Sequence, residues 1–127
     1  MVLLRVGGCT MLLATLAIGL PTRWMASIHH WLGLGTFPVF PIVEYLTRSI
    51  SALYAIHGGL LLLVSSDIRR FAPVVRYLGV TTSLLGISLL AIDVVAGLPV
   101  YWIIFEGPPV ILIGGLILGL LEASGYR

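Results

Sequence analysis

The sequence contains no lysine, asparagine or glutamine, and charged residues make up only 9% of its 127 positions. Soluble domains carry about 25% charged residues, so this chain lacks the polar side chains that a water-facing surface needs. The deficit excludes an ordinary soluble protein, a nucleic-acid-binding protein and a disordered chain. We expect membrane lipid to be its surroundings, and the net charge of +2 reflects loop topology rather than an anionic partner.

A single cysteine, Cys9, is present, which excludes an intrachain disulfide and a zinc site built on a cysteine pair. Hydrophobic residues make up 59% of the chain and its mean hydropathy is +1.13. We therefore expect a single transmembrane domain over residues 1–127, with no metal site.

Four apolar stretches reach the roughly 20 residues that a helix needs to cross a bilayer core about 30 Å thick. They cover residues 2–20, 42–64, 73–96 and 100–121. The sequence thus predicts an all-α integral membrane protein, a four-helix bundle. The turn between the second and third stretches holds Arg69 and Arg70, so the positive-inside rule places this turn and both termini in the cytoplasm.

The outer connection, residues 21–41, predicts a short helix that lies in the membrane interface between the first two spans. Thr22 is placed to cap this helix and Gly33 to end it. Trp24, Ile28 and Trp31 share one face, and tryptophan favours the headgroup layer.

Three histidines and a tryptophan are candidate contacts with a partner or ligand. His29 and His30 lie in the outer connection, as polar residues at the wet edge of the interfacial helix or as a metal or proton site. His57 falls on an apolar face near the inner third of its span, where we expect a bond to a carbonyl or hydroxyl of another helix. Haem ligation within one chain would need a second buried histidine at similar depth, and none is present. Trp102 anchors the start of the fourth span.

Four charged residues fall in the outer half of the predicted bundle. Glu44 and Arg48 stand four residues apart on one helix face, within reach of each other. Asp93 lies about one turn from the outer end of the third span, and Glu106 lies at a depth that matches Arg48. Ionisable groups are costly in a membrane unless they are paired or wet, so these residues predict an outward-facing polar pocket. The charged residues do not identify the ligand, which stays unknown; a bound lipid or quinone would be compatible with such a pocket.

Glu106 is followed by Gly107, Pro108 and Pro109, which should kink or break the fourth span. Broken backbone in a bilayer requires a covering of protein or water. This segment is therefore either one wall of the pocket or a structural kink whose charge Arg48 neutralises.

Stripes of small residues predict where the helices approach one another closely. One stripe of the second span joins Gly58 and Gly59 to Glu44 and Arg48, and one stripe of the third span joins Gly79 and Gly86 to Asp93. We expect these faces to point inward. On the fourth span a GxxxG stripe, Gly115 and Gly119, lies opposite Glu106, so that helix can contact neighbours on two sides.

The sequence also contains an internal similarity. Arg5-x-x-Gly8-x-Thr10 in the first span is matched by Arg76-x-x-Gly79-x-Thr81 in the third. Each of these two spans ends in Gly-Leu-Pro-x-x-Trp, at residues 19–24 and 97–102. A Gly-Gly-Leu sequence follows in each half. Two parallel hairpins related by an axis along the membrane normal would give this pattern, although helix termination and tryptophan anchoring also account for it.

The chain resembles small bacterial four-helix membrane proteins of the DoxX-like type and related uncharacterised families. The resemblance rests on length, four spans, the run TRSISALYAIHGG from Thr47 to Gly59, and the basic turn Asp67-Ile68-Arg69-Arg70. It implies the bacterial inner membrane and a loose link to quinone-coupled redox or oxidative-stress complexes. The chain lacks the cysteine pair that thiol redox chemistry would need.

We therefore expect a small membrane subunit or accessory protein, without catalytic chemistry of its own, that forms a homo-oligomer or joins a larger membrane complex. The alternative is a small-molecule-binding protein, transporter or quinone-linked enzyme that uses Glu44, Arg48, Asp93 and Glu106. Divalent metal binding by these carboxylates with His29 or His30 is a further use of the same pocket.

Overall fold

The computed structural model describes residues 2–125, and every regular element in that range is an α-helix. Three helices are long and apolar enough to cross a membrane: α4 (Pro41–Ser66), α5 (Ala72–Ala96) and α6 (Val100–Ala123). Their ends lie within two residues of the predicted spans. The prediction of an all-helical chain with membrane-type helices is therefore confirmed.

The first apolar stretch differs from the single span predicted over residues 2–20. It forms two consecutive helices, α1 (Val2–Leu12) and α2 (Ala14–Ile18), interrupted at Leu13. At the break the Leu13 N–H donates to the Thr10 carbonyl three residues back, and the Thr10 hydroxyl donates to the Val6 carbonyl. Residues 2–18 span only about 25 Å, which is short of a bilayer core.

The connection that follows contains the expected short helix, α3 (Thr22–Trp31). Gly33 adopts a positive φ of 74° just beyond it, as its predicted role in ending the helix requires. The predicted capping role of Thr22 is wrong. Pro21 occupies the N-cap position, and the Thr22 hydroxyl donates instead to Glu44 in α4.

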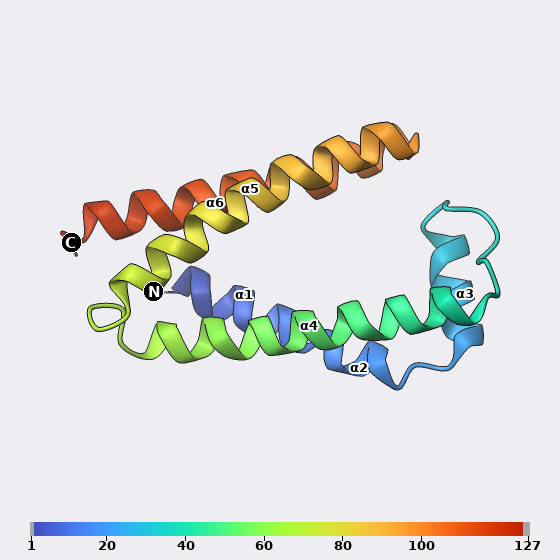
Figure 1. The fold of residues 1–127 in the computed structure, drawn as a ribbon, viewed down its shortest axis with the longest axis horizontal. Helices are drawn as coiled ribbons and strands as arrows, with labels where there is room; N and C mark the ends of the chain where they lie inside the picture. The colour runs from blue at the N-terminus through green and yellow to red at the C-terminus, as the bar shows by residue number, and fades with distance from the viewer. Residues whose placement is uncertain (1, 126–127) are drawn as a thin grey trace. The chain divides into compact units, whose positions relative to one another are not determined.

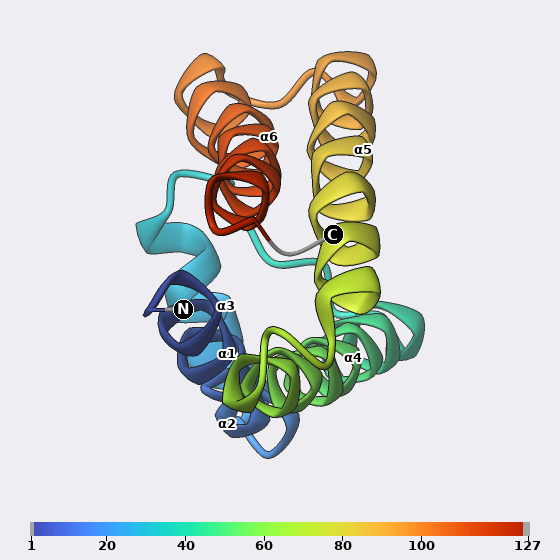
Figure 2. The same ribbon diagram turned by 90° about the vertical axis from the view of Figure 1, so that its left-hand side faces the viewer.

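The chain divides into two compact units, residues 1–65 and residues 66–127, here named the first and second units. In the first unit α1 crosses α4 where Gly8 meets Gly58, so closely that a Cβ on Gly58 would lie 2.7 Å from the Gly8 carbonyl oxygen. In the second unit α5 and α6 run side by side and antiparallel (Figure 1), and the view along them shows the same pairing (Figure 2). A Cβ on Gly114 would lie 2.7 Å from the Gly79 carbonyl oxygen.

Buried positions recur every seven residues along the second unit. On α5 they are Ala72, Gly79, Gly86 and Asp93, and on α6 they are Gly107, Gly114 and Leu121. The inward orientation predicted for the face of α5 that carries Gly79, Gly86 and Asp93 is thus confirmed. Small residues at these positions allow close backbone approach, which is how helices associate where the solvent is lipid.

The two units repeat each other in packing as well as in sequence. Gly8 meets Gly58 in the first unit and Gly79 meets Gly114 in the second. The second glycine of each Gly-Gly pair lies in the open, since a Cβ on Gly59 or on Gly115 would meet nothing within 4 Å. These correspondences support the internal repeat that the sequence suggests.

Each unit also begins a helix in the same way after its Gly-Leu-Pro segment. The Trp24 N–H donates to the Pro21 carbonyl at 2.8 Å, and the Trp102 N–H donates to the Pro99 carbonyl at 2.8 Å. The backbone angles of the two prolines agree, with φ/ψ of −59°/139° and −55°/142°. The proline therefore starts α3 and α6 alike.

The sequence predicts a kink or a break at Pro108 and Pro109; the break is wrong, because α6 continues through both residues, and the kink stays a prediction. Neither proline can donate a backbone hydrogen bond, so two helical bonds are missing. Gly107 beside them is buried, and a Cβ there would lie 2.8 Å from the Leu90 Cβ and 3.0 Å from the Gly86 carbonyl oxygen. The helix packs closely against α5 at this point, and in lipid a continuous helix satisfies the remaining backbone groups.

Candidate polar site

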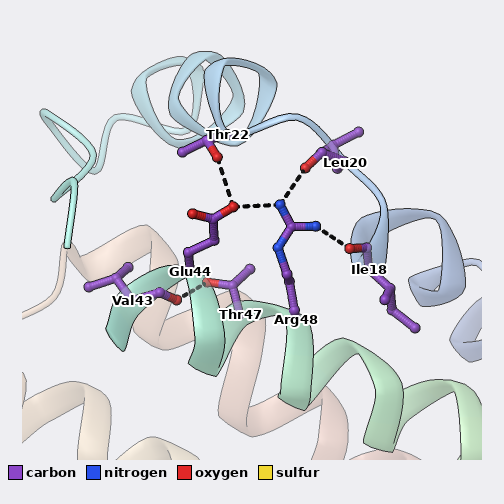
Figure 3. Close-up of polar contacts among 7 residues, drawn as sticks. All are labelled: Ile18, Leu20, Thr22, Val43, Glu44, Thr47 and Arg48. Carbon is purple, nitrogen blue, oxygen red and sulfur yellow. Dashed lines mark hydrogen bonds and ion pairs between the residues drawn. The ribbon is translucent and has the colours of Figure 1, made fainter. Parts of the chain in front are cut away.

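The predicted pairing of Glu44 with Arg48 is present near the start of α4. Their side chains form an ion pair of 2.6 Å between Arg48 Nη2 and Glu44 Oε1 (Figure 3). The Thr22 hydroxyl donates to the same carboxylate oxygen at 2.9 Å. Glu44 also stands in the first turn of α4, where the positive end of the helix dipole stabilises a carboxylate.

Arg48 also binds backbone groups of the preceding segment. Its guanidinium donates to the carbonyl of Ile18 through Nη1 and to the carbonyl of Leu20 through Nη2, the latter at 3.2 Å (Figure 3). These carbonyls lie at the end of α2, where the chain leaves the helix, and Pro21 has no N–H to donate. Arg48 thus holds the end of the first apolar stretch and the start of α3 against α4.

This network is only partly buried, with side-chain exposures of 31% for Arg48 and 38% for Glu44. Two other polar side chains on the same face of α4 bond within the helix: Thr47 donates to the Val43 carbonyl at 2.8 Å and Ser51 donates to the Thr47 carbonyl at 2.8 Å. Polar groups of this face are therefore satisfied locally. The arrangement is that of a structural clasp between α2, α3 and α4.

Asp93 has a different environment in the second unit. Its residue exposure is 3%, and its Oδ2 atom is buried without a hydrogen-bond partner among the described residues. Its backbone carbonyl accepts the Leu98 N–H at 3.1 Å, which closes the end of α5. The carboxyl group is therefore held at the turn that joins α5 to α6.

The four predicted pocket residues divide between the two units. Glu44 and Arg48 belong to the first unit, whereas Asp93 and Glu106 belong to the second, on α5 and α6. Glu106 is half-buried and lies in the second turn of α6, which begins at Val100. A shared pocket for all four residues stays a prediction.

The histidines of the outer connection take part in local structure. The His29 ring packs edge-on against Phe37 at 5.4 Å between centroids, and its Nδ1 lies 3.2 Å from the Gly35 carbonyl oxygen. Gly35 has a positive φ of 83°, which suits glycine at this bend. His30 is exposed. Within residues 2–125 no three histidine, cysteine or carboxylate side chains gather closely enough to hold a metal ion.

The remaining candidate contacts are half-buried. His57 and Trp102 both have intermediate exposure, and the described residues give the His57 ring no hydrogen bond. The bond predicted from His57 to a carbonyl or hydroxyl of another helix is therefore not seen within residues 2–125.

Three of the six predicted packing glycines, Gly59, Gly115 and Gly119, do not pack closely against another helix. Gly115 and Gly119 are exposed, and a Cβ on Gly59, Gly115 or Gly119 would meet nothing within 4 Å. By contrast, Gly58, Gly79 and Gly86 make close backbone contacts. The GxxxG stripe of α6 thus lies on a second, open face of that helix, as the helical phase predicts.

Sequence reasoning missed the role of Thr22 and of the two carbonyls that Arg48 binds. The Gly19-Leu20-Pro21 segment was the available signal, because a proline after a helix end leaves carbonyls that need a donor from elsewhere.

Comparison with protein-family models, with curated proteins and with solved structures gives no match.

Proposed function

We propose that this protein is a small integral membrane subunit or accessory protein that associates with itself or with a larger membrane complex through α6. The observation that supports this proposal is the open glycine stripe. A Cβ on Gly115 or Gly119 would meet nothing within 4 Å among the described residues, whereas Gly107 and Gly114 pack closely against α5. Helices in lipid associate through such small-residue surfaces.

The test is the assembly state of the protein in lipid nanodiscs and in native membranes, measured by chemical cross-linking and native mass spectrometry. Gly119→Leu should weaken the assembly, because a leucine side chain on the open face would keep a second helix from approaching closely. Ala91→Leu is the matched control, since it adds similar bulk at an exposed position on α5 and should leave the assembly unchanged. A wild-type protein that is monomeric in both settings would contradict the proposal.

The alternative proposal is a ligand-binding role, as a transporter or quinone-linked enzyme, for the residues Glu44, Arg48, Asp93 and Glu106. Asp93 favours this ligand-binding role, because a buried carboxyl oxygen without a hydrogen-bond partner is uncommon outside functional sites. The clasp of Arg48 and Glu44 favours a structural role, because its donors and acceptors are engaged within the first unit. Lipid and quinone analysis of the protein purified from native membranes distinguishes the two proposals.

We further propose a four-helix bundle in a bacterial inner membrane, with α3 at the outer interface and both termini in the cytoplasm. The excess of arginine in the turn between α4 and α5 supports this orientation. In a Cys9→Ser background, Ser66→Cys should be protected from an impermeant thiol reagent added outside intact cells, whereas Thr36→Cys should react. Labelling of position 66 from outside would reverse the orientation.

A further inference from the structure

The turn between α4 and α5, together with the first turns of α5, carries an excess of positive charge. Residues 66–77 contain three arginines, Arg69, Arg70 and Arg76, against one carboxylate, that of Asp67. All three arginines are exposed, and none of them forms an ion pair within the described residues. This segment therefore presents three guanidinium groups that are available to an anionic ligand.

Local contacts hold the turn in place. The Asp67 side chain accepts the Arg70 N–H at 3.1 Å, and the Asp67 carbonyl accepts the Phe71 N–H at 3.1 Å. The Arg70 guanidinium lies over the Phe71 ring, 5.6 Å from its centroid, which is within the range of a cation–π contact. A guanidinium that stacks on a ring keeps the N–H donors at its edge open to a phosphate.

An exposed apolar strip runs along α5 from Arg76. Val80, Leu84 and Ile87 follow that arginine at i+4, i+8 and i+11, which places them on one side of the helix, and all three are exposed. Tyr77 is also exposed beside Arg76, and tyrosine favours the boundary between the headgroups and the hydrocarbon. A ligand bound at the arginines would therefore find room for acyl chains along the same helix.

We propose that Arg69, Arg70 and Arg76 bind the headgroup of an anionic phospholipid, whose acyl chains lie along the exposed strip of α5. Arginine matches phosphate oxygens with pairs of N–H donors, and basic residues at a membrane surface attract anionic lipids. A zwitterionic phospholipid brings an ammonium group that the arginines repel, and a soluble phosphate would leave the apolar strip unused. The inference is independent of the proposed assembly through Gly115 and Gly119.

Native mass spectrometry of the full chain in mild detergent tests the proposal, with phosphatidylglycerol and phosphatidylcholine supplied in equal amounts. Both lipids contain a phosphate, but only phosphatidylglycerol is anionic, and the wild-type protein should retain it in preference. The triple variant Arg69→Gln, Arg70→Gln and Arg76→Gln should lower this preference by about fivefold for each arginine removed. Arg23→Gln is the matched control, because it removes one exposed arginine of α3, and it should keep the preference.

A photoactivatable phosphatidylglycerol keeps the test decisive even if the triple variant fails to fold. With its reactive group in an acyl chain, this lipid should label the wild-type protein within residues 77–87, and excess inorganic phosphate should not displace it. The proposal is overturned if the wild-type protein shows no preference for phosphatidylglycerol, if the folded triple variant keeps the preference, or if Arg23→Gln loses it to the same extent. Absence of label on residues 77–87, or displacement of the lipid by inorganic phosphate, would also overturn it.

Discussion

Gly58 and Gly59 are adjacent in the sequence but occupy opposite environments, so the same substitution at each should have opposite effects on stability. A Cβ on Gly58 would lie 2.7 Å from the Gly8 carbonyl oxygen and 2.9 Å from the Leu12 nitrogen. Both contacts are with backbone, so no side-chain rotation can relieve them. A Cβ on Gly59 would meet nothing within 4 Å.

The expected size follows from two terms. To restore an ordinary contact of 3.4 Å, α1 must move away from α4 by about 0.7 Å, and overpacking of this kind costs about 1–3 kcal/mol. Alanine favours a helix over glycine by about 1 kcal/mol at either position. Gly59→Ala should therefore raise the free energy of unfolding by about 1 kcal/mol, and the two variants should differ by about 1–3 kcal/mol.

The assay is equilibrium unfolding in mixed detergent micelles with increasing sodium dodecyl sulfate, followed by circular dichroism. Native mass spectrometry under the same conditions verifies that wild type and both variants are compared in the same assembly state. If Gly58→Ala unfolds at the same detergent fraction as Gly59→Ala, or at a higher one, the close crossing of α1 and α4 does not stabilise the first unit.

Three further predictions use the same unfolding assay. Arg48→Leu should destabilise the first unit, because Glu44 loses its cation and two backbone carbonyls lose their donor. Adding Glu44→Leu should recover part of the lost stability. A double variant that is less stable than Arg48→Leu would refute this. Thr22→Val should cause a smaller loss, since it removes one donor to Glu44, and an effect as large as that of Arg48→Leu would argue against the assigned roles. Pro109→Ala should stabilise α6 by up to about 3 kcal/mol by restoring a donor for the Phe105 carbonyl, whereas a loss of stability would show that the proline is needed for packing.

The long helices could be predicted from the sequence because their signal is local. Each of α4, α5 and α6 is an apolar run of bilayer length with glycine, proline or polar residues at its ends. The pairing of Glu44 with Arg48 was also local, since residues four apart on a helix are neighbours. Helical phase likewise identified Gly79, Gly86 and Asp93 as one buried face.

The failed predictions depend on contacts between elements. Threonine is a residue type that caps helices, but the Thr22 hydroxyl donates instead to the Glu44 carboxylate in α4, 22 residues away in sequence. Two consecutive prolines are typical of a helix break, but α6 continues through them where Gly107 packs closely against α5. The interruption at Leu13 also carries no signal in residue type, because Thr81 makes the same bond to its own helix as Thr10 does and α5 continues through it. None of these outcomes follows from residue type alone.

The seven-residue spacing of the buried positions on α5 and α6 also determines how the two helices wind. A straight α-helix drifts by about 20° per seven residues relative to such a spacing, so a pair that keeps it must coil around itself with a left-handed twist. Gly79, Gly86 and Asp93 on α5 and Gly107, Gly114 and Leu121 on α6 keep that phase over the length of the hairpin. One residue inserted between Gly86 and Asp93 would rotate the carboxyl by about 100° and out of the seam. The spacing of the glycines, as much as their size, therefore keeps the acid of α5 between the helices and away from lipid.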